Sequence, residues 1–184
     1  NRLTHLDLSA CGNLETVLCG ENPLTNLDLS NCANLQMLEC GGGRLRNLDL
    51  TACANLQYLE CRDNQLTCLD LSACTNLVLV RCWYNPLTNM VLSTCTNLVG
   101  LVCSSNLLTN LDISACIDLH DLWCATNSLT ILNISSNKAL VHFDATGNPL
   151  TNIVVWWNPP TTNNKPSTLK TFRYDGSPTF TYSP

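Results

Sequence analysis

Hydrophobic and polar residues alternate along this chain in a pattern that returns every 21 residues. The stretch LTNLDLSNCANLQMLECGGGR at 24–44 is followed by LRNLDLTACANLQYLECRDNQ at 45–65 and by LTCLDLSACTNLVLVRCWYNP at 66–86. Seven such units run from Leu3 to Pro149 without an insertion or a deletion. A fixed period of this length predicts a solenoid, in which each unit is one turn of a coil and is stabilised by its neighbours.

Each unit contains two halves, and both halves predict a short β-strand. In the first half, Asn26, Leu27 and Asp28 illustrate an out-in-out alternation that is typical of a half-buried strand. The second half alternates in the same way. We call the outward side of the first half face A and that of the second half face B. Stacking the turns in register places equivalent residues ~4.8 Å apart, so the sequence predicts a mostly β coil with two short parallel sheets and little or no helix.

Both halves also fit the core pattern of leucine-rich repeats, L-x-x-L-x-L-x-x-N/C. The first half carries it at Leu24, Leu27, Asp28, Leu29, Ser30 and Cys32, and the second half at Leu56, Leu59, Cys61 and Asn64. Over residues 3 to about 158 the chain resembles the short bacterial leucine-rich repeats that nest two cores in one unit, sometimes called IRREKO repeats. The resemblance implies a leucine-rich-repeat solenoid of about eight turns, and such repeats have many binding and adhesion roles.

The residues after Pro149 change character but complete one domain, 1–184. We expect an expanded eighth repeat at 150–178 with an inserted loop at 156–168, because LKTFRYDGSP at 169–178 aligns with LVHFDATGNP at 140–149. Residues 179–184 are expected to form a terminal strand or cap. Phe172 and Tyr174 replace leucine and cysteine at inward positions, as aromatic residues that close a coil would do.

Thirteen cysteines fall almost entirely on two positions of the repeat. One row is Cys11, Cys32, Cys53, Cys74, Cys95 and Cys116, and the other is Cys19, Cys40, Cys61, Cys82, Cys103 and Cys124. In-register neighbours keep their Cβ atoms at about the strand spacing, beyond the ~3.8 Å that a disulfide prefers. We therefore predict twelve buried free thiols, with disulfides or a bound metal as the alternatives. Cys68 lies outside both rows and is predicted to be the exposed, reactive thiol.

An asparagine row at the corner after the second strand is expected to bind buried backbone groups of adjacent turns. Its members are Asn22, Asn64, Asn85, Asn106, Asn127 and Asn148. Gly43 interrupts the row inside a run of three glycines, which predicts a local backbone irregularity in the second turn.

Composition and charge narrow the classes of partner. Only 12% of the residues are charged and the net charge is -5, so the chain lacks the basic face that nucleic acid requires. No apolar run approaches the ~18 residues that span a bilayer, so we expect no transmembrane segment and no membrane insertion. The chain begins Asn-Arg-Leu without a signal-peptide pattern, as a processed chain or a fragment would. We expect an extracellular or cell-surface location and no cofactor.

Face B is the predicted binding surface because its outward residues change in every turn, whereas those of face A hardly vary. Aromatic residues and arginine are the usual anchors of recognition. The candidates are Tyr58, Glu60, Arg62, Leu79, Arg81, Trp83, Tyr84 and Trp123. The register predicts that Tyr58 lies beside Leu79, that Glu60 pairs with Arg81, and that Arg62 lies over Trp83. We expect a non-enzymatic module that binds a protein or glycan around Trp83; alternatively, these pairs only stabilise an exposed sheet.

Face A carries a row of carboxylates at one outward position. The row comprises Asp7, Asp28, Asp49, Asp70 and Asp112. Unit charges ~4.8 Å apart repel by roughly 1 kcal/mol in water, so hydrogen bonds or cations must offset the repulsion. Hydrogen bonding to neighbouring Ser, Thr and Asn is the simpler interpretation. Calcium binding by the first four carboxylates is the alternative, because calcium prefers oxygen ligands.

Residues suited to catalysis are few, so we predict that the chain is not an enzyme. Only His120, Asp121, His142 and Asp144 gather on one patch of face B. Asp121 and His142 occupy the same position in adjacent turns, and we expect a hydrogen bond between them. An ordinary surface pair is the favoured interpretation of that contact.

The ends of the coil suggest a second functional hypothesis. Only two residues precede Leu3, so Leu3 and Leu6 are expected to be uncovered, and either a missing segment or another molecule would cover them. Phe180 and Tyr182, on the last predicted strand, could stack beneath them in a second copy. Such a head-to-tail contact does not close and would build a filament.

Overall fold

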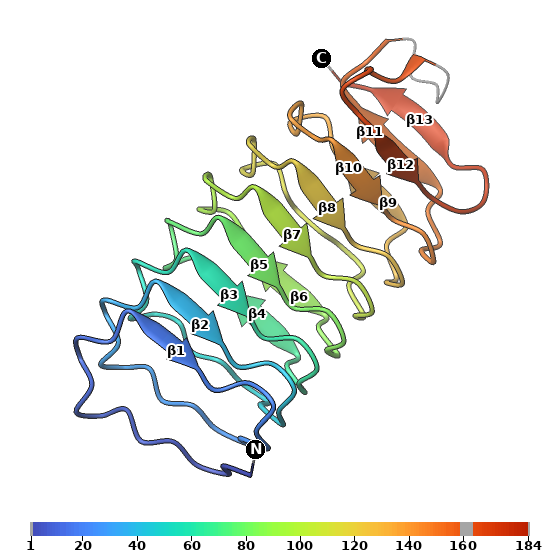
Figure 1. Cartoon of the computed structure of the whole chain (residues 1–184). Helices are drawn as coiled ribbons and strands as arrows, with labels where there is room; N and C mark the ends of the chain where they lie inside the picture. Colours follow the sequence, from blue (N-terminus) through green and yellow to red (C-terminus); the bar gives the residue numbers. More distant parts are fainter. Residues whose placement is uncertain (1, 159–163, 184) are drawn as a thin grey trace.

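The computed structural model describes residues 2–158 and 164–183, which wind into a stack of turns with the two termini at opposite ends (Figure 1). Apart from Asn164, which has 3₁₀ geometry, the secondary-structure elements of these residues are β-strands. Along one side runs an eight-stranded parallel sheet of β1 (Thr16–Leu18), β2 (Met37–Glu39), β3 (Tyr58–Glu60), β5 (Leu79–Arg81), β7 (Gly100–Val102), β8 (Asp121–Trp123), β10 (His142–Asp144) and β12 (Thr171–Arg173). Face B is the outer surface of this sheet. Equivalent residues are 21 apart, except between β10 and β12, where His142 and Thr171 are 29 apart.

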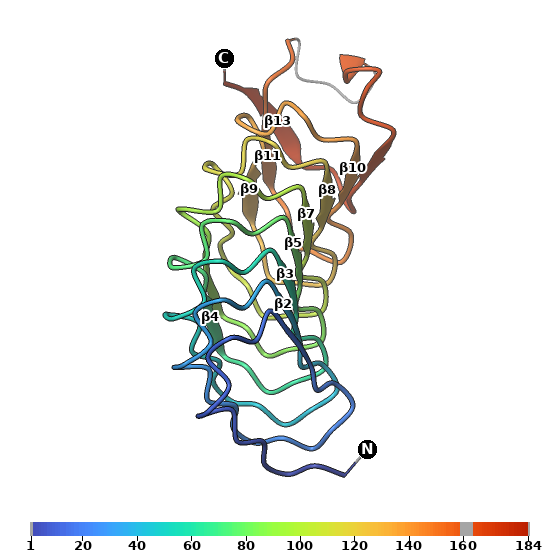
Figure 2. The ribbon, with the colours of Figure 1, turned by 60° about the vertical axis from the view of Figure 1, so that its left-hand side comes forward.

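The strands of face A form on the opposite side of the coil but not in every turn (Figure 2). They are β4 (Cys68–Asp70) paired with β6 (Asn89–Val91), and β9 (Ile131–Asn133), β11 (Asn152–Val155) and β13 (Thr179–Tyr182) in a second small sheet. The predicted parallel β-coil is confirmed, but on this side the strands form two small sheets with turns between them that have no strand. The sequences Asn-Leu-Asp at 26–28, 47–49 and 110–112 form no strand, because Asn and Asp both disfavour strands. Strands form where Cys, Val, Ile or Thr replaces one or both of them.

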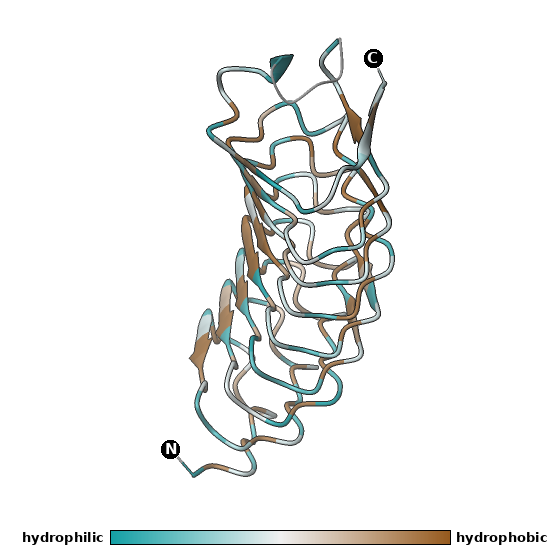
Figure 3. Cartoon of the chain, turned by 90° about the vertical axis from the view of Figure 1, so that its right-hand side faces the viewer, coloured by the Kyte–Doolittle hydropathy of each residue, from teal (hydrophilic) through white to brown (hydrophobic). Residues whose placement is uncertain are grey.

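The core consists of leucine rows that run the length of the coil. Leu35, Leu56, Leu77, Leu98, Leu119 and Leu140 are equivalent residues and are all fully buried. Figure 3 shows that hydrophobic and hydrophilic segments alternate along each turn. Each turn therefore relies on its neighbours to cover its apolar residues, as expected of a solenoid.

All thirteen cysteines are free thiols, and eleven of them are buried. Cys68 is exposed, as predicted. Cys11 corrects the prediction of twelve buried thiols, because it is only half-buried. It lies in the first turn, which has a neighbouring turn on one side only. The two rows act as small apolar filling between the leucines.

The corner asparagines bind the backbone of two turns at once, as predicted. The Nδ2 atom of Asn106 donates to the carbonyl oxygens of Cys103 at 3.0 Å and of Cys82, one turn earlier, at 3.1 Å. Its Oδ1 atom accepts the backbone N–H of Leu87 at 3.1 Å. Asn64, Asn85 and Asn127 repeat the arrangement in their own turns.

The glycine run does not disturb the path of the second turn, contrary to the prediction. Every turn has one residue in the left-handed region at this corner, and Gly42 has a φ of 71°, the same as Gly147. What changes is one hydrogen bond. Because Gly43 offers no side-chain acceptor, the backbone N–H of Leu24 bonds to the carbonyl oxygen of Asn22 at 2.7 Å instead.

A second asparagine row, which we did not predict, lies exposed in the loop between the two halves. Each Nδ2 atom donates to a carbonyl oxygen of the preceding turn at 3.0–3.1 Å. The pairs are Asn34 with Gly12, Asn55 with Ala33, Asn76 with Ala54 and Asn97 with Thr75. The Asn-Leu pair that follows five of the six first-row cysteines was its sequence signal.

Aromatic side chains fill the C-terminal end of the coil. The ring of Phe172 lies 4.9 Å from that of the fully buried Phe143 and 5.6 Å from that of Trp157. Tyr174 and Phe180 pack against Phe172 on its other sides. Phe172 and Tyr174 thus lie against the core but stay half-buried. Of the predicted loop at 156–168, residues 159–163 lie outside the described part of the chain.

The residues of the filament hypothesis lie at both ends of the stack. Leu3 is 49% exposed and Leu6 is half-buried, while Tyr182 is 42% exposed. Phe180 packs within the aromatic cluster, with its ring 5.6 Å from that of Tyr174. Assembly into a filament stays a prediction.

The described residues contain no helix long and apolar enough to cross a membrane.

Candidate functional site

Arg62 is the centre of a charge cluster on face B. Its guanidinium contacts Glu60 at 2.8 Å, Asp63 at 2.8 Å and, from the first turn, Glu21 at 3.0 Å. Hydrogen bonds to Asp63 and Glu60 raise the pKa of the Arg62 guanidinium further above its ordinary value. The sequence predicted that Arg62 lies over Trp83, but it did not predict the three carboxylates around its guanidinium.

The predicted pairs of adjacent turns are present. Tyr58 is the Cα partner of Leu79, and Glu60 that of Arg81. An Nη1 atom of Arg81 lies 3.6 Å from Oε2 of Glu60. The guanidinium carbon of Arg62 lies 5.6 Å from the ring centroid of Trp83, within the range of a cation–π interaction.

A hollow of about 470 Å³ opens on face B beside these pairs. It is lined by Arg81, Trp83, Tyr84, Val102, Ser104, Ser105 and Trp123. Large side chains of two turns surround it, and the turn between them contributes small ones. Leu79 folds over Gly100 in that middle turn, since a Cβ atom on Gly100 would lie 2.8 Å from Cδ1 of Leu79.

Four of the lining residues were predicted from the sequence, and three were not. Arg81, Trp83, Tyr84 and Trp123 were candidates, and the structure brings them to one hollow. Val102, Ser104 and Ser105 were not. Small residues at variable positions between two aromatic turns were the signal that could have found them. Tyr58, Glu60, Arg62 and Leu79 lie beside the hollow rather than in it.

Tyr84 occupies the left-handed corner position with a φ of 54°. Glycine holds this position at 42, 147 and 176, where it has no steric cost. A bulky residue with positive φ costs about 1 kcal/mol or more, and the same corner holds Glu21, Asp63, Ser105 and Thr126 in other turns. The side chain of Tyr84 is also 59% exposed, so core packing does not account for it.

The histidine patch does not form the predicted contact. His142 is the Cα partner of Asp121, but its Nδ1 atom lies 3.0 Å from Oγ1 of Thr171 on the other side. Its ring stacks on Trp123 with centroids 6.3 Å apart. His120 instead contacts the carbonyl oxygen of Asp118 at 2.8 Å. His142 therefore supports the far wall of the hollow.

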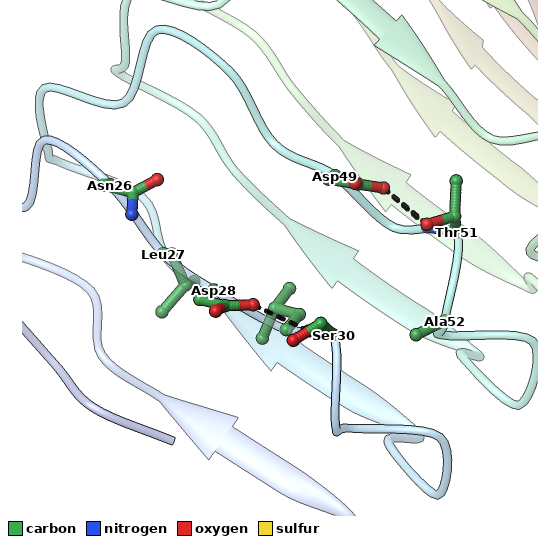
Figure 4. Close-up of a pocket in the computed structure, with 8 residues that line it drawn as sticks. Asn26, Leu27, Asp28, Ser30, Asp49, Thr51 and Ala52 are labelled. Carbon is green, nitrogen blue, oxygen red and sulfur yellow. Dashed lines mark hydrogen bonds between the residues drawn. The ribbon is translucent and has the colours of Figure 1, made fainter. Parts of the chain in front are cut away.

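Each aspartate of face A closes a local turn. Figure 4 shows Asp28 and Asp49 beside a shallow hollow of about 220 Å³, each hydrogen-bonded to the residue two positions on. Oδ1 of Asp28 accepts the backbone N–H of Ser30 at 2.9 Å, and Asp49 accepts both N–H and hydroxyl of Thr51. These bonds hold the pKa values of both carboxyls below the ordinary 3.8.

Asp7, Asp70 and Asp112 make the same turn. Neighbouring hydroxyl and backbone amide groups thus donate hydrogen bonds to the carboxylates. This is the geometry expected if hydrogen bonds, rather than bound cations, offset the repulsion along the row. Within residues 2–158 and 164–183, no three His, Cys, Asp or Glu side chains lie where they could hold a metal ion.

Cys68 is expected to react with thiol reagents far faster than the two rows. It is exposed on β4, whereas burial raises the pKa of Cys61 and Cys103 to about 12. Thiol titration of the native chain at mild alkaline pH should show one fast thiol, a slower one from Cys11, and the rest only after unfolding. Cys68→Ser should remove the fast phase. Rapid labelling of the row cysteines in that variant would contradict this.

The sequence matches no protein-family model and no curated protein. Many solved structures nevertheless share the fold. The functional domain of InlJ from Listeria monocytogenes, which includes a cysteine ladder, aligns with a TM-score of 0.63 at 26% identity and covers 98% of this chain. A leucine-rich-repeat protein of Leptospira interrogans aligns with a TM-score of 0.73 at 24% identity over 88% of this chain. This chain thus has the leucine-rich-repeat fold.

A third match is the leucine-rich-repeat ectodomain of the Arabidopsis thaliana receptor kinase GASSHO1/SCHENGEN3, solved in complex with CASPARIAN STRIP INTEGRITY FACTOR 2. It aligns with a TM-score of 0.70 at 20% identity over 96% of this chain. The chain spans 47% of the InlJ structure, 43% of the Leptospira protein and 22% of the receptor ectodomain.

Proposed function

We propose that this chain is a non-enzymatic recognition module that binds a protein partner on face B, centred on the hollow beside Trp83. One observation carries the proposal. Trp83, Tyr84 and Trp123 surround a single hollow together with Arg81. Tryptophan, tyrosine and arginine are the side chains that most often dominate binding energy.

The frame of the hollow supports the proposal. Its residues project from or directly follow β5, β7 and β8, which are hydrogen-bonded neighbours in the eight-stranded sheet. A rigid frame lowers the entropy lost on binding. The left-handed corner is common to all turns, and at position 84 it presents an exposed aromatic ring.

The similar folds agree with this class of function. The plant receptor ectodomain was solved with a bound factor, and an extracellular or cell-surface location is part of our proposal for this chain. The two hypotheses of a filament and of a cation-binding aspartate row have no comparable supporting observation.

The test compares two double variants. Peptides selected on the wild-type chain from a displayed library of random linear peptides serve as the probe. Trp83→Ala with Tyr84→Ala should weaken their binding about tenfold or more, because both side chains line the hollow. Binding is measured by biolayer interferometry, and circular dichroism should be unchanged.

Asp28→Asn with Asp49→Asn is the matched control on face A. Asparagine can keep the local turn, as Asn133 does when its Oδ1 accepts the N–H of Ser135 at 3.0 Å. Binding by this control should equal that of the wild type. If the face A variant loses binding and the Trp83 variant does not, the proposed face is wrong.

A further inference from the structure

Face B has a charge pattern that specifies the chemistry of its partner. We propose that the hollow receives a protein segment with an apolar side chain next to a carboxylate, flanked on both sides by lysine or arginine. This inference rests on the proposed function, because it assumes that the hollow is the binding site.

At the centre of the pattern is Arg81, whose guanidinium has hydrogen-bond donors that the structure does not use. Arg81 makes its ion pair with Glu60 at the long distance of 3.6 Å, and its side chain is 47% exposed. Glu60 is already bound by Arg62 at 2.8 Å. Arg81 therefore keeps most of its five donors for a partner, and a carboxylate is the group that fits a guanidinium best.

Beside Arg81 the hollow is largely apolar. The ring systems of Trp83, Tyr84 and Trp123 and the methyl groups of Val102 line it. An aliphatic or aromatic side chain that enters it removes apolar surface from water on both partners, at about 25 cal/mol for each Å². The carboxylate of the partner must therefore be adjacent to an apolar residue.

Carboxylates outnumber cations on the N-terminal flank of face B. The carboxylates there are Glu21, Glu39, Glu60 and Asp63, with Arg62 as the cation among them. Toward the C-terminus Asp121 on β8 is the carboxylate nearest the hollow. Asp144 is buried and bonded to Thr146, and Asp175 is outnumbered by Lys165, Lys170 and Arg173. A uniformly acidic partner, such as a polyanionic glycan, would be repelled by the N-terminal flank and by Asp121. Basic residues on each side of the anchor would be attracted.

The register of the sheet sets the spacing of those basic residues. Glu39 on β2 and Asp121 on β8 are four strands apart in the order β2-β3-β5-β7-β8. With strands ~4.8 Å apart, the two carboxylates lie roughly 19 Å apart along the stack. An extended chain covers about 3.4 Å per residue, so that distance corresponds to about six residues. The partner segment thus crosses the strands, with basic residues about six positions apart and the anchor between them.

The experiment sequences the peptides that the wild-type chain selects from the displayed library. We expect enrichment of an apolar residue next to Asp or Glu, with Lys or Arg on both sides at about that spacing. Glu39→Lys with Asp121→Lys should weaken binding of a selected peptide about tenfold, and added sodium chloride should weaken binding to the wild type.

A face A variant provides the matched control for charge. Asn26, Asn47, Asn89 and Asn110 are exposed at one equivalent position of face A. Changing all four to lysine alters the net charge by the same amount as the two reversals on face B. Binding of the selected peptide should stay within about twofold of the wild type, because the added charges lie on the far side of the coil.

The outcomes separate this inference from the proposed function. Selected peptides that depend on Trp83 and Tyr84 but lack basic flanks, or that tolerate the two reversals, overturn the charge pattern and leave the proposed function standing. Peptides that are indifferent to Trp83 and Tyr84 overturn both. A glycan array gives a third reading: a glycan bound only with Trp83 intact would identify a saccharide site and overturn the protein segment.

Discussion

Asn106→Ala should lower the free energy of unfolding by about 3 kcal/mol. The Nδ2 atom of Asn106 donates to carbonyl oxygens of two turns, and its Oδ1 atom accepts the backbone N–H of Leu87. Alanine leaves the buried N–H of Leu87 without a partner and removes one of the two bonds to each carbonyl oxygen, which keep those from Asn85 and Asn127. Urea denaturation followed by far-UV circular dichroism measures the change.

Asn97→Ala is the control for this prediction. Asn97 also donates to the preceding turn, through Nδ2 to the carbonyl oxygen of Thr75 at 3.1 Å, but that bond is exposed. Water can replace it, so the change should stay within about 0.5 kcal/mol. Equal losses in the two variants would show that burial of the corner is not what makes its asparagines important.

Phe143→Ala should cost about 3–5 kcal/mol and loosen the C-terminal end of the coil. Phe143 is fully buried, and its ring lies 4.9 Å from that of Phe172. Alanine leaves a cavity where the last two strands of the large sheet meet. The same urea experiment measures the loss, and near-UV circular dichroism should report the disturbed aromatic cluster.

Phe143→Leu separates volume from aromatic packing. Leu122 is the Cα partner of Phe143 in the preceding turn, so the coil already accepts leucine at this position. We expect a loss of about 1 kcal/mol. A loss as large as that of the alanine variant would mean that the stacked rings, rather than the filled volume, stabilise this end.

The coil could be predicted from sequence because its information is repeated. An error about one leucine or cysteine is corrected by its five or more equivalents, and the corner asparagines followed from the same register. The first row of strands was less predictable. Whether a strand forms at 68–70 but not at 47–49 depends on single residues, such as Cys68 in place of Asn47. The repeat pattern predicts the same structure for all equivalent positions and so does not distinguish such residues.

The site was predictable only as a list of large side chains. Trp83, Tyr84 and Trp123 could be found because they depart from the repeat. The hollow forms because Ser104 and Ser105 have small side chains. Small residues were not among the predicted binding residues, because that prediction relied on large aromatic side chains and arginine. The three carboxylates around Arg62 were also missed, because Glu21 reaches it from 41 positions away. A side chain that spans two turns is not contained in a nearest-neighbour register.

The corner asparagines and the sheet join each turn to the next by bonds that run parallel to the long axis of the stack. When the two ends of the coil are pulled apart, the force acts along these bonds. The bonds between neighbouring turns therefore break one turn at a time. Each turn that yields releases about 70 Å of extended chain from its 21 residues. A module of this construction lengthens in equal steps under tension, while the turns that have not yet opened keep their face B residues in register.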